Sequence, residues 1–286
     1  MDFRGRTGAG LRALRRLAPG ALALALGACV NERQEQQIGD RVAAQVNAQV
    51  PMVHDAALNA YVTGLGRSIT RNSGRPGVPF KFYIVDTDQV NAFALPGGHV
   101  YVNRGLTERT RSQAELAAVI AHEVAHVAAR HGVRNLQRQL RTSSLVSVMY
   151  RMILGREPEI LDQDALNLGG ALWSASNSRA EESEADQLAV KYLIRSGVDP
   201  HGMVKLLRRL LAEEKSNPGP GEQVAWFASH PTTESRVRNT EREIRADLPT
   251  PNPRLMLDVP GFPLFLARMR QLPPPPIPVP LPLPAQ

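Results

Sequence analysis

The chain has a single cysteine, Cys29, and few aromatic residues, which make up 5% of its 286 residues. One cysteine excludes an intramolecular disulfide framework, a cysteine-rich zinc finger and a CxxC redox site. The apolar segments 17–28 and 143–154 are both shorter than the roughly 20 residues that a membrane-spanning helix needs. No internal repeat of about 20–50 residues is present, so no solenoid is expected.

What the chain does have is enough apolar residues for a folded domain, and a positive net charge. Hydrophobic residues make up 43% and charged residues 21%, which is typical of globular proteins. The 34 Lys and Arg exceed the 27 Asp and Glu, giving a formal net charge of +7. Residues 1–28 hold five arginines and one aspartate, so they carry four of these seven charges. The rest of the chain is weakly basic, and no nucleic-acid partner is expected.

The N-terminus is typical of an export signal. Its arginines precede the apolar run 17–28, which ends in Leu26-Gly-Ala-Cys29. These four residues resemble the bacterial lipobox, in which the cysteine is acylated and becomes the first residue after cleavage. We therefore predict a lipoprotein signal peptide over 1–28 and lipidation of Cys29, with an ordinary signal peptide and an incidental cysteine as the alternative. Two or three acyl chains anchor a protein stably to a membrane.

These features predict a lipid-anchored protein of the bacterial periplasm, tethered to a membrane through Cys29. The residue after the cysteine is Val30 and not aspartate. In this respect the sequence resembles Gram-negative lipoproteins that are sent to the outer membrane. The outer membrane is therefore the expected location.

Hydrophobic periodicity predicts an α+β fold that is mainly helical and has a small sheet. Helices are predicted over residues 31–50, 55–69, 112–131, 143–155, 178–196, 200–214 and 232–246. Strands are predicted over residues 80–86, 92–95 and 99–102, the last two as a hairpin around Pro96-Gly97-Gly98. The segment 143–154 is either an amphipathic lid over a cleft or a core helix.

The sequence His122-Glu-Val-Ala-His126 lies in an alanine-rich segment that is predicted to be helical. Residues four apart lie on one face of a helix, so both imidazoles can bind the same Zn²⁺. Glu123 then lies beside the metal, where its carboxylate can take a proton from a water molecule. The pattern predicts one Zn²⁺ per chain, with His122 and His126 as ligands and Glu123 as the general base.

A catalytic zinc site needs a third protein ligand. The extended pattern HExxHxxGxxH is not present, because Ala129 and Gly132 stand where it has glycine and histidine. A carboxylate on a later helix is the alternative, and residues 178–186 contain three glutamates.

Spacing favours Glu182 among these glutamates. Asp186 lies one turn further along the same helical face, where it could hold the free ring nitrogen of a zinc-binding histidine. Glu181 and Glu184 are expected to face solvent, and Glu181 fits a capping box with Ser178.

Four motifs in this order resemble one family of metallopeptidases. They are Asn91-Ala-Phe-Ala-Leu-Pro-Gly-Gly98, His122-Glu-Val-Ala-His126, Ser178-Arg-Ala-Glu-Glu182-Ser-Glu-Ala-Asp186, and Ser229-His230-Pro231 followed by Arg236. Over about residues 35–246 the chain is similar to the HtpX/CAAX-prenyl-protease family of gluzincin zinc metallopeptidases, peptidase family M48. The likeness is strongest to its bacterial lipoprotein branch, which includes BepA- and LoiP-type periplasmic proteases.

The resemblance implies a gluzincin domain with the small sheet or hairpin at the active-site cleft. It also implies that Glu182 is the third zinc ligand and that Asp186 supports the site. His230 is then a catalytic residue, which either donates to the oxyanion in the transition state or occupies the open zinc position in a self-inhibited resting form. His99 and His131 are expected to be structural.

The implied function is a zinc metalloendopeptidase that cleaves misfolded or misassembled polypeptides of the cell envelope, with the envelope assembly machinery as a further partner. The alternative is a chaperone-like or scaffold lipoprotein with a latent zinc site. Asn91, Ala92 and Phe93 are candidates for a strand edge that holds an extended substrate through backbone hydrogen bonds. The alternative for these residues is a plain hairpin that completes the sheet.

Composition and motifs divide the chain into four parts. They are the signal peptide 1–28, a lipid-anchored N-terminal helix or linker 29–50, the zinc metallopeptidase domain 51–248, and a proline-rich tail 249–286. The tail holds 13 of the 23 prolines and is predicted to be disordered or extended, with a docking strip for a partner as the alternative.

Overall fold

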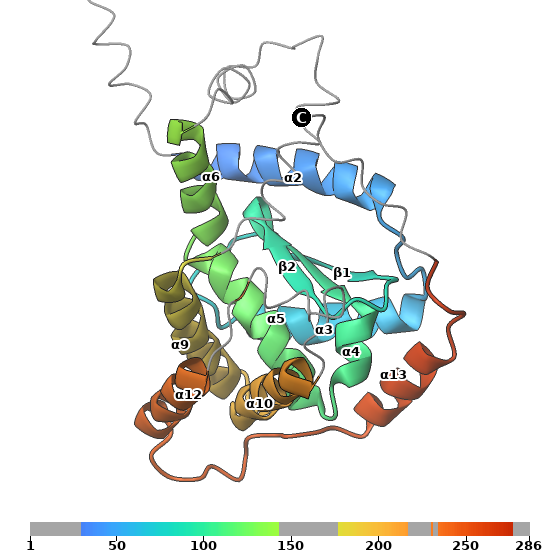
Figure 1. The fold of residues 1–286 in the computed structure, drawn as a ribbon, viewed down its shortest axis with the longest axis vertical. Helices are drawn as coiled ribbons and strands as arrows, with labels where there is room; N and C mark the ends of the chain where they lie inside the picture. The colour runs from blue at the N-terminus through green and yellow to red at the C-terminus, as the bar shows by residue number, and fades with distance from the viewer. Residues whose placement is uncertain (1–29, 143–176, 217–229, 231–233, 277–286) are drawn as a thin grey trace, which may run out of the picture. The chain divides into compact units, whose positions relative to one another are not determined.

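The structure is a computed structural model that describes residues 30–142, 177–216, 230 and 234–276. All the elements discussed here belong to one unit, residues 32–286. The predicted α+β class is confirmed, because most of the described elements are helices and three strands form a small sheet (Figure 1). The helices are α2 (Glu32–Gln49), α3 (Ala56–Thr70), α4 (Arg104–Arg109), α5 (Gln113–Ala128), α6 (His131–Thr142), α9 (Arg179–Arg195), α10 (His201–Ser216), α12 (Glu234–Asp247) and α13 (Gly261–Arg270).

The sheet has the strand order β1-β3-β2, from β1 (Lys81–Val85), β2 (Ala92–Leu95) and β3 (His99–Asn103). β1 pairs with β3 in parallel, and β2 pairs with β3 as the predicted antiparallel hairpin. The hairpin turns through the short 3-10 helix η1 (Pro96–Gly98), where Gly97 and Gly98 have φ of 78° and 94°. Residues with a side chain rarely adopt such φ values, which explains why both positions are glycine. Within the described part of the chain, β2 is an edge strand.

Alternate residues of the sheet face two different layers. Val100 and Val102 of β3 point into the hydrophobic core, together with residues of α3 and α5. His99 and Tyr101 point the other way, toward α2. His99 Nε2 forms a hydrogen bond with the carboxylate of Asp40, and the Tyr101 hydroxyl donates to Asn47 Oδ1. The sheet therefore lies between α2 on one face and α3 with α5 on the other (Figure 1).

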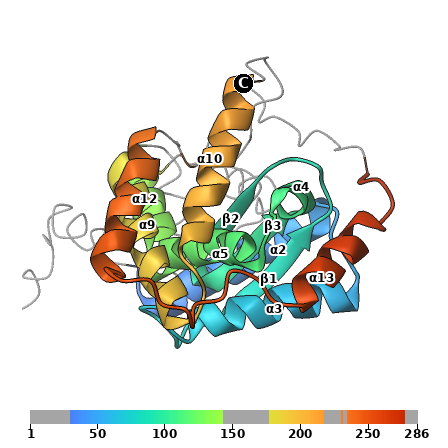
Figure 2. The ribbon, with the colours of Figure 1, turned by 90° about the horizontal axis from the view of Figure 1, so that it is seen from below.

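Helix α5 runs through the centre of the fold. Its N-cap is Ser112, whose hydroxyl accepts the backbone N–H of Glu115 at 3.3 Å. Its residues from Ala114 to Val127 are all buried, and the helix packs against α3, α9, α10 and the sheet (Figure 2). It ends at Ala128, and Arg130 then adopts the left-handed conformation with φ of 59° before α6 begins. The predicted helix 112–131 thus corresponds to α5, which ends three residues earlier than predicted, and α6 was not predicted.

Helix α9 begins with the predicted capping box, in which Ser178 and Glu181 bond to each other's backbone N–H groups. The expectation that Glu181 faces solvent is wrong, because the side chain is 7% exposed and pairs with Arg138 of α6 at 3.0 Å. Helices α10 and α12 cover the outer side of α9 and α5 (Figure 2).

Helix α2 is part of the packed domain, although residues 29–50 are predicted to be a separate lipid-anchored helix or linker. It buries Ile38, Val42 and Ala43. Its Glu35 is 2% exposed and pairs with Arg75 at 3.0 Å and with Arg130 at 2.9 Å. Residues 32–49 therefore contribute to the fold, and the domain starts before residue 51.

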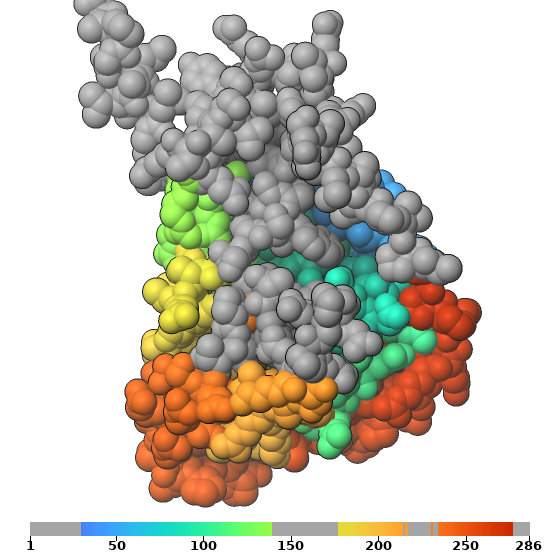
Figure 3. All heavy atoms as spheres, in the orientation of Figure 1, coloured from blue at the N-terminus to red at the C-terminus, as the bar shows by residue number. Residues whose placement is uncertain are grey.

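The predicted boundary at residue 248 is also wrong. Backbone hydrogen bonds join Met256 to Gly197 and Leu257 to Ala114, and helix α13 then packs Phe262, Phe265 and Met269 onto the core. Helix α13 lies on the opposite side of the domain from α9 and α12 (Figure 3). The prolines of residues 249–286 predict a disordered or extended tail, and the apolar spacing of α13 covers only ten residues.

No helix among the described residues is long and apolar enough to cross a membrane. The predicted signal peptide 1–28, Cys29, the helix 143–155 and residues 277–286 of the tail lie outside the described residues.

Candidate active site

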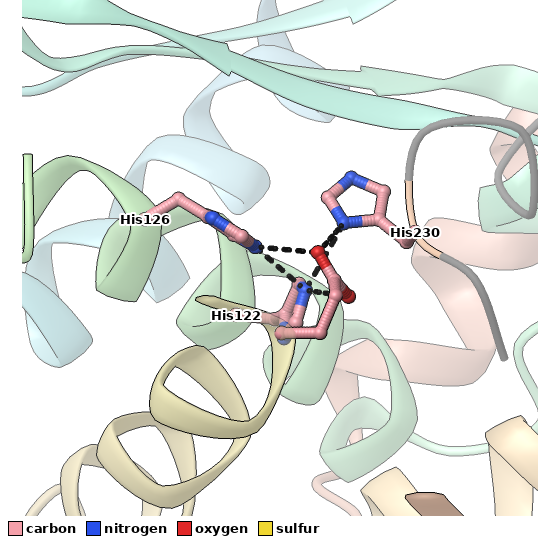
Figure 4. Close-up of side chains that lie close together, drawn as sticks. His122, His126 and His230 are labelled. Atoms are coloured by element: carbon pink, nitrogen blue, oxygen red, sulfur yellow. Dashed lines mark hydrogen bonds and ion pairs between the residues drawn. The ribbon is translucent and has the colours of Figure 1, made fainter. Parts of the chain in front are cut away.

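Helix α5 places His122 and His126 one turn apart on the same face. Both side chains are buried, and their Nε2 atoms are 3.0 Å apart. Two imidazole nitrogens this close need either a hydrogen or a shared cation between them. Figure 4 shows both rings pointing toward a third ring, that of His230.

Two other segments complete a four-residue cluster. Glu182 comes from the first turns of α9, and its Oε1 lies 3.3 Å from His126 Nε2. His230 precedes α12, and its Nδ1 lies 2.9 Å from Glu182 Oε1 and 3.3 Å from His122 Nε2. The four side chains are buried, and one ligand atom from each lies within 4.8 Å of the others.

This donor set fits a tetrahedral metal ion. A metal bound at about 2.0–2.1 Å to four nitrogen and oxygen atoms holds those atoms about 3.3 Å apart. Four of the six separations between His122 Nε2, His126 Nε2, Glu182 Oε1 and His230 Nδ1 range from 2.9 to 3.3 Å. The cluster therefore has both the ligand types and the spacing of a small-cation site.

The second nitrogen of His122 is held by a carboxylate. His122 Nδ1 lies 3.0 Å from Asp186 Oδ1, and Asp186 stands one turn after Glu182 on α9. Burial opposes a charge on His122, but the carboxylates of Asp186 and Glu182 outweigh it and raise its pKa to about 9. A ligand oriented in this way by a carboxylate is typical of metal-binding histidines.

Arg236 of α12 joins the two carboxylates of α9. Its Nε lies 2.6 Å from Asp186 Oδ2, and its Nη1 lies 2.6 Å from Glu182 Oε2. Burial alone would raise the pKa of Asp186, yet the guanidinium charge holds that pKa below its usual value. Arg236 thus keeps both carboxylates ionised in a buried place.

Glu123 lies beside the cluster and not in it. Its side chain is 1% exposed, and its Oε1 lies 3.4 Å from His230 Nε2. Burial raises the pKa of this carboxyl group, and Oε1 accepts no hydrogen bond from the described residues. A buried carboxylate with a raised pKa next to a metal-type donor set is suited to accept a proton.

The hairpin residues Asn91, Ala92 and Phe93 lie at and just before the edge strand β2. Ala92 is buried in the core, and the Phe93 ring stacks on Tyr101 with centroids 4.6 Å apart. Strands of the sheet pass close to the three histidines (Figure 4). The side chains of Ala92 and Phe93 are thus used for packing within the domain.

Two residues at the site were not assigned a role from the sequence. Arg236 was included in a motif without a role. Its position six residues after His230 was the feature of the sequence that placed it near the site. His131 was expected to be structural, but its Nδ1 lies 2.7 Å from His126 Nδ1. That contact depends on the sharp turn at Arg130, which no periodicity indicates.

Comparisons with known proteins show a family match for this chain. The family model for peptidase family M48 matches residues 56–244. A beta-barrel assembly-enhancing protease of Yersinia pestis is 33% identical over 232 residues, covering 79% of this chain and 47% of that protein. Metalloprotease LoiP of Escherichia coli K12 is 26% identical, covering 76% of this chain and 83% of that protein.

Another relative, mitochondrial metalloendopeptidase OMA1 of Schizosaccharomyces pombe, is 29% identical over 72% of this chain and 56% of its own length. The chain spans about half the length of the beta-barrel assembly-enhancing proteases that it matches. The matched residues 56–244 contain α5, α9 and His230, which supply the whole four-residue cluster. The chain belongs to peptidase family M48, the metallopeptidase family that its motifs indicate.

Proposed function

We propose that this protein is a zinc-dependent endopeptidase of the bacterial envelope. The observation that carries the proposal is the buried cluster of His122, His126, Glu182 and His230, with Glu123 beside it. Histidine and carboxylate ligands in tetrahedral spacing suit Zn²⁺ better than calcium or magnesium, which prefer more oxygen ligands. We assign His122, His126 and Glu182 as the zinc ligands.

When bound, zinc supplies a Lewis acid that polarises the scissile carbonyl and acidifies water. Glu123 takes a proton from the attacking water and passes it to the nitrogen of the leaving amine. Asp186 holds His122 by its Nδ1, and Arg236 holds both Asp186 and Glu182, so the ligands need little reorganisation during the reaction. These roles account for every buried charge close to the cluster.

His230 has a different role in this proposal. With His230 Nδ1 among the donors, four protein atoms complete a tetrahedron, and a catalytic site needs one position for water. We propose that the described arrangement is a resting form, and that His230 must move away before a peptide is cleaved.

The substrates that we propose are misfolded or misassembled envelope proteins. The name of two relatives, beta-barrel assembly-enhancing protease, supports an envelope role. Edge strand β2 would bind an extended segment through its backbone, which favours unfolded chains of many sequences. Ala92→Pro should slow cleavage of unfolded casein; an unchanged rate in the folded variant would contradict this binding mode.

We also propose that Cys29 is lipidated and anchors the protein to the outer membrane. The support is the lipobox-like sequence Leu26-Gly-Ala-Cys29 with Val30 after it. Cells fed radiolabelled palmitate should label the protein and not its Cys29→Ser variant. The variant should also be found in the soluble fraction after the cells are broken. Label in both proteins, or membrane association of both, would contradict the anchor.

Replacing Glu123 tests the mechanism. Glu123→Gln keeps the shape of the side chain but cannot accept the proton, so it should bind one zinc per chain and lose casein cleavage by about 100-fold or more. Zinc content by atomic absorption and the cleavage rate are measured on the same preparation. Cleavage at the parent rate would contradict the mechanism.

The second candidate function is a chaperone-like or scaffold lipoprotein with a latent zinc site. It is favoured by the same closure of the cluster by His230. The two candidates differ in what happens when His230 is removed: a resting protease gains activity, whereas a scaffold does not.

A further inference from the structure

The two metal-type histidines of α5 are supported in different ways. His122 Nδ1 contacts the carboxylate of Asp186 directly, at 3.0 Å. Among the described residues, no carboxylate contacts His126 Nδ1, which instead meets the ring of His131, with 2.7 Å between the two Nδ1 atoms. The far nitrogen of His131, Nε2, lies 3.1 Å from Glu184 Oε2. A chain of contacts therefore leads from the cluster through two imidazoles to a carboxylate.

The hydrogens along this chain have one consistent arrangement. A neutral imidazole carries one N–H, so His126 with Nε2 free for a metal must carry its hydrogen on Nδ1. That N–H donates to Nδ1 of His131, whose own hydrogen is then on Nε2 and donates to Glu184. The reverse arrangement would place a hydrogen on Nε2 of His126 and a lone pair of His131 against the carboxylate. The geometry thus selects the metal-binding tautomer of His126.

The contact between His131 and His126 depends on an unusual backbone conformation at Arg130. This residue has φ of 59°, a left-handed conformation that non-glycine residues rarely adopt. The resulting turn ends α5 and starts α6 at His131, which brings the fully buried ring of His131 back against His126. The Arg130 side chain is held by Glu35 of α2 at 2.9 Å. A strained turn that is secured by another helix indicates that the position of His131 is required.

Glu184 is held in place as well. Its side chain is 49% exposed, and Arg134 of α6 contacts the same Oε2 atom at 3.1 Å. Glu184 follows Glu182 by two residues on α9, so the helix that supplies the cluster's carboxylate also supplies the end of this chain. Residues that orient a metal-binding histidine typically change metal affinity by 10–100-fold when they are replaced.

We propose that His131 and Glu184 are positioning residues that hold His126 in its metal-binding tautomer, as Asp186 does for His122. The inference rests on the proposed metal site and assigns two residues that the motifs left without a role. His131 touches neither substrate nor metal and acts only through His126.

Zinc affinity of the full-length chain tests the proposal, measured with Zn²⁺ alone in competition with a chromogenic chelator. His131→Phe keeps the ring volume and removes the acceptor, so the dissociation constant should rise about 10–100-fold. In His131→Asn the amide oxygen can replace Nδ1, and affinity should stay within about threefold of the parent. Leu136→Val, a buried change on the same helix, should lower thermal stability without changing the dissociation constant.

Glu184→Ala provides a variant that does not disturb the core. Because Glu184 is half exposed, the protein should fold, and the zinc dissociation constant should rise about 3–10-fold. Glu213→Ala is the matched control, since Glu213 also pairs with an arginine, Arg109, at 2.8 Å and is one-third exposed. The control should bind zinc like the parent.

A second readout needs no metal. In metal-free protein with ¹⁵N-labelled histidine, nuclear magnetic resonance should show the Nδ1–H tautomer of His126 in the parent and a mixture of tautomers in His131→Phe. Unchanged zinc affinity and unchanged tautomer in folded His131→Phe would overturn the proposal. If the parent itself does not bind zinc, or binds it as well after His122→Ala, the proposed metal site fails together with this inference.

Discussion

At the scale of single residues, the local part of the site could be predicted from the sequence. His122, Glu123 and His126 are fixed by the helical repeat, and Asp186 lies beside His122 because it is one turn from Glu182. These contacts need only the geometry of two helices. Contacts that depend on how segments pack could not be predicted in this way.

Arg236 and His131 illustrate the second kind of contact. Arg236 meets Asp186 only because α12 packs on α9, and His131 meets His126 only because Arg130 adopts a left-handed conformation. The burial of Glu181 has the same origin, since Arg138 of α6 covers it. A periodic pattern contains no information about such partners.

Arg236 carries a prediction about the metal-free protein. Arg236→Met would leave Glu182 and Asp186 as buried carboxylates without the guanidinium, which typically costs about 3–5 kcal/mol. Zinc supplies positive charge beside Glu182, so the loss should be smaller in the loaded protein. Urea denaturation with and without zinc measures both values.

Arg236→Lys is the informative companion. Lysine keeps the charge but lacks the planar guanidinium that bonds to both carboxylates. The stability of Arg236→Lys should therefore fall between that of the parent and that of Arg236→Met. Equal stability of all three proteins without metal would contradict the role assigned to Arg236.

At the scale of elements, helix α13 was missed because its neighbours are rich in proline. Its apolar residues Phe262, Phe265 and Met269 follow a helical spacing, but the segment is only ten residues long. The Phe265 ring stacks on Tyr61 of α3 with centroids 4.3 Å apart, and Arg104 donates to the carbonyl of Leu272 at the end of the helix. Tertiary contacts, and not helix propensity, stabilise this element.

The packing of α13 can be tested with two residues of the same helix. Phe262 is 1% exposed, and Phe262→Ala should lower the free energy of unfolding by about 3–5 kcal/mol. Leu264 is 73% exposed, and Leu264→Ala should change it by less than about 0.5 kcal/mol. Urea denaturation checks both, and equal effects would show that α13 does not pack as described.

Helix α2 and the sheet share a buried histidine that makes stability depend on pH. Burial lowers the pKa of His99 from its usual value, although Asp40 of α2 partly offsets this, and Lys81 and Tyr83 are its other neighbours. A histidine whose pKa is lower in the folded state destabilises the fold as pH drops below its unfolded pKa of about 6.5. This penalty grows until pH falls through the lowered folded pKa.

The expected signature is a difference between two proteins. The parent should lose more stability between pH 7 and pH 5 than His99→Gln, which cannot be protonated. Denaturation at several pH values measures the two slopes, and the other histidines cancel in the comparison. Parallel pH profiles would contradict a buried neutral His99.

At the scale of the whole molecule, the domain joins segments that are far apart in the sequence around α5. Helix α2 secures the turn after α5, α9 supplies Glu182 and Asp186, and the segment before α12 supplies His230. The predicted boundaries at 50 and 248 were therefore too narrow on both sides, because the flanking segments pack on the same core. The motifs identified the metal-type residues. The packing of the helices places His230 in the cluster, next to Glu182.

The central claim is that this molecule is a zinc peptidase held at rest by His230. Its most direct test is the initial rate of casein cleavage by zinc-loaded His230→Ala relative to the parent, with the double variant Glu123→Gln/His230→Ala as control. Removing the fourth protein ligand should open a position for water and raise the rate by about tenfold or more, with no cleavage by the double variant. A rate for His230→Ala that is no higher than the parent's, or cleavage by the double variant, would contradict the account.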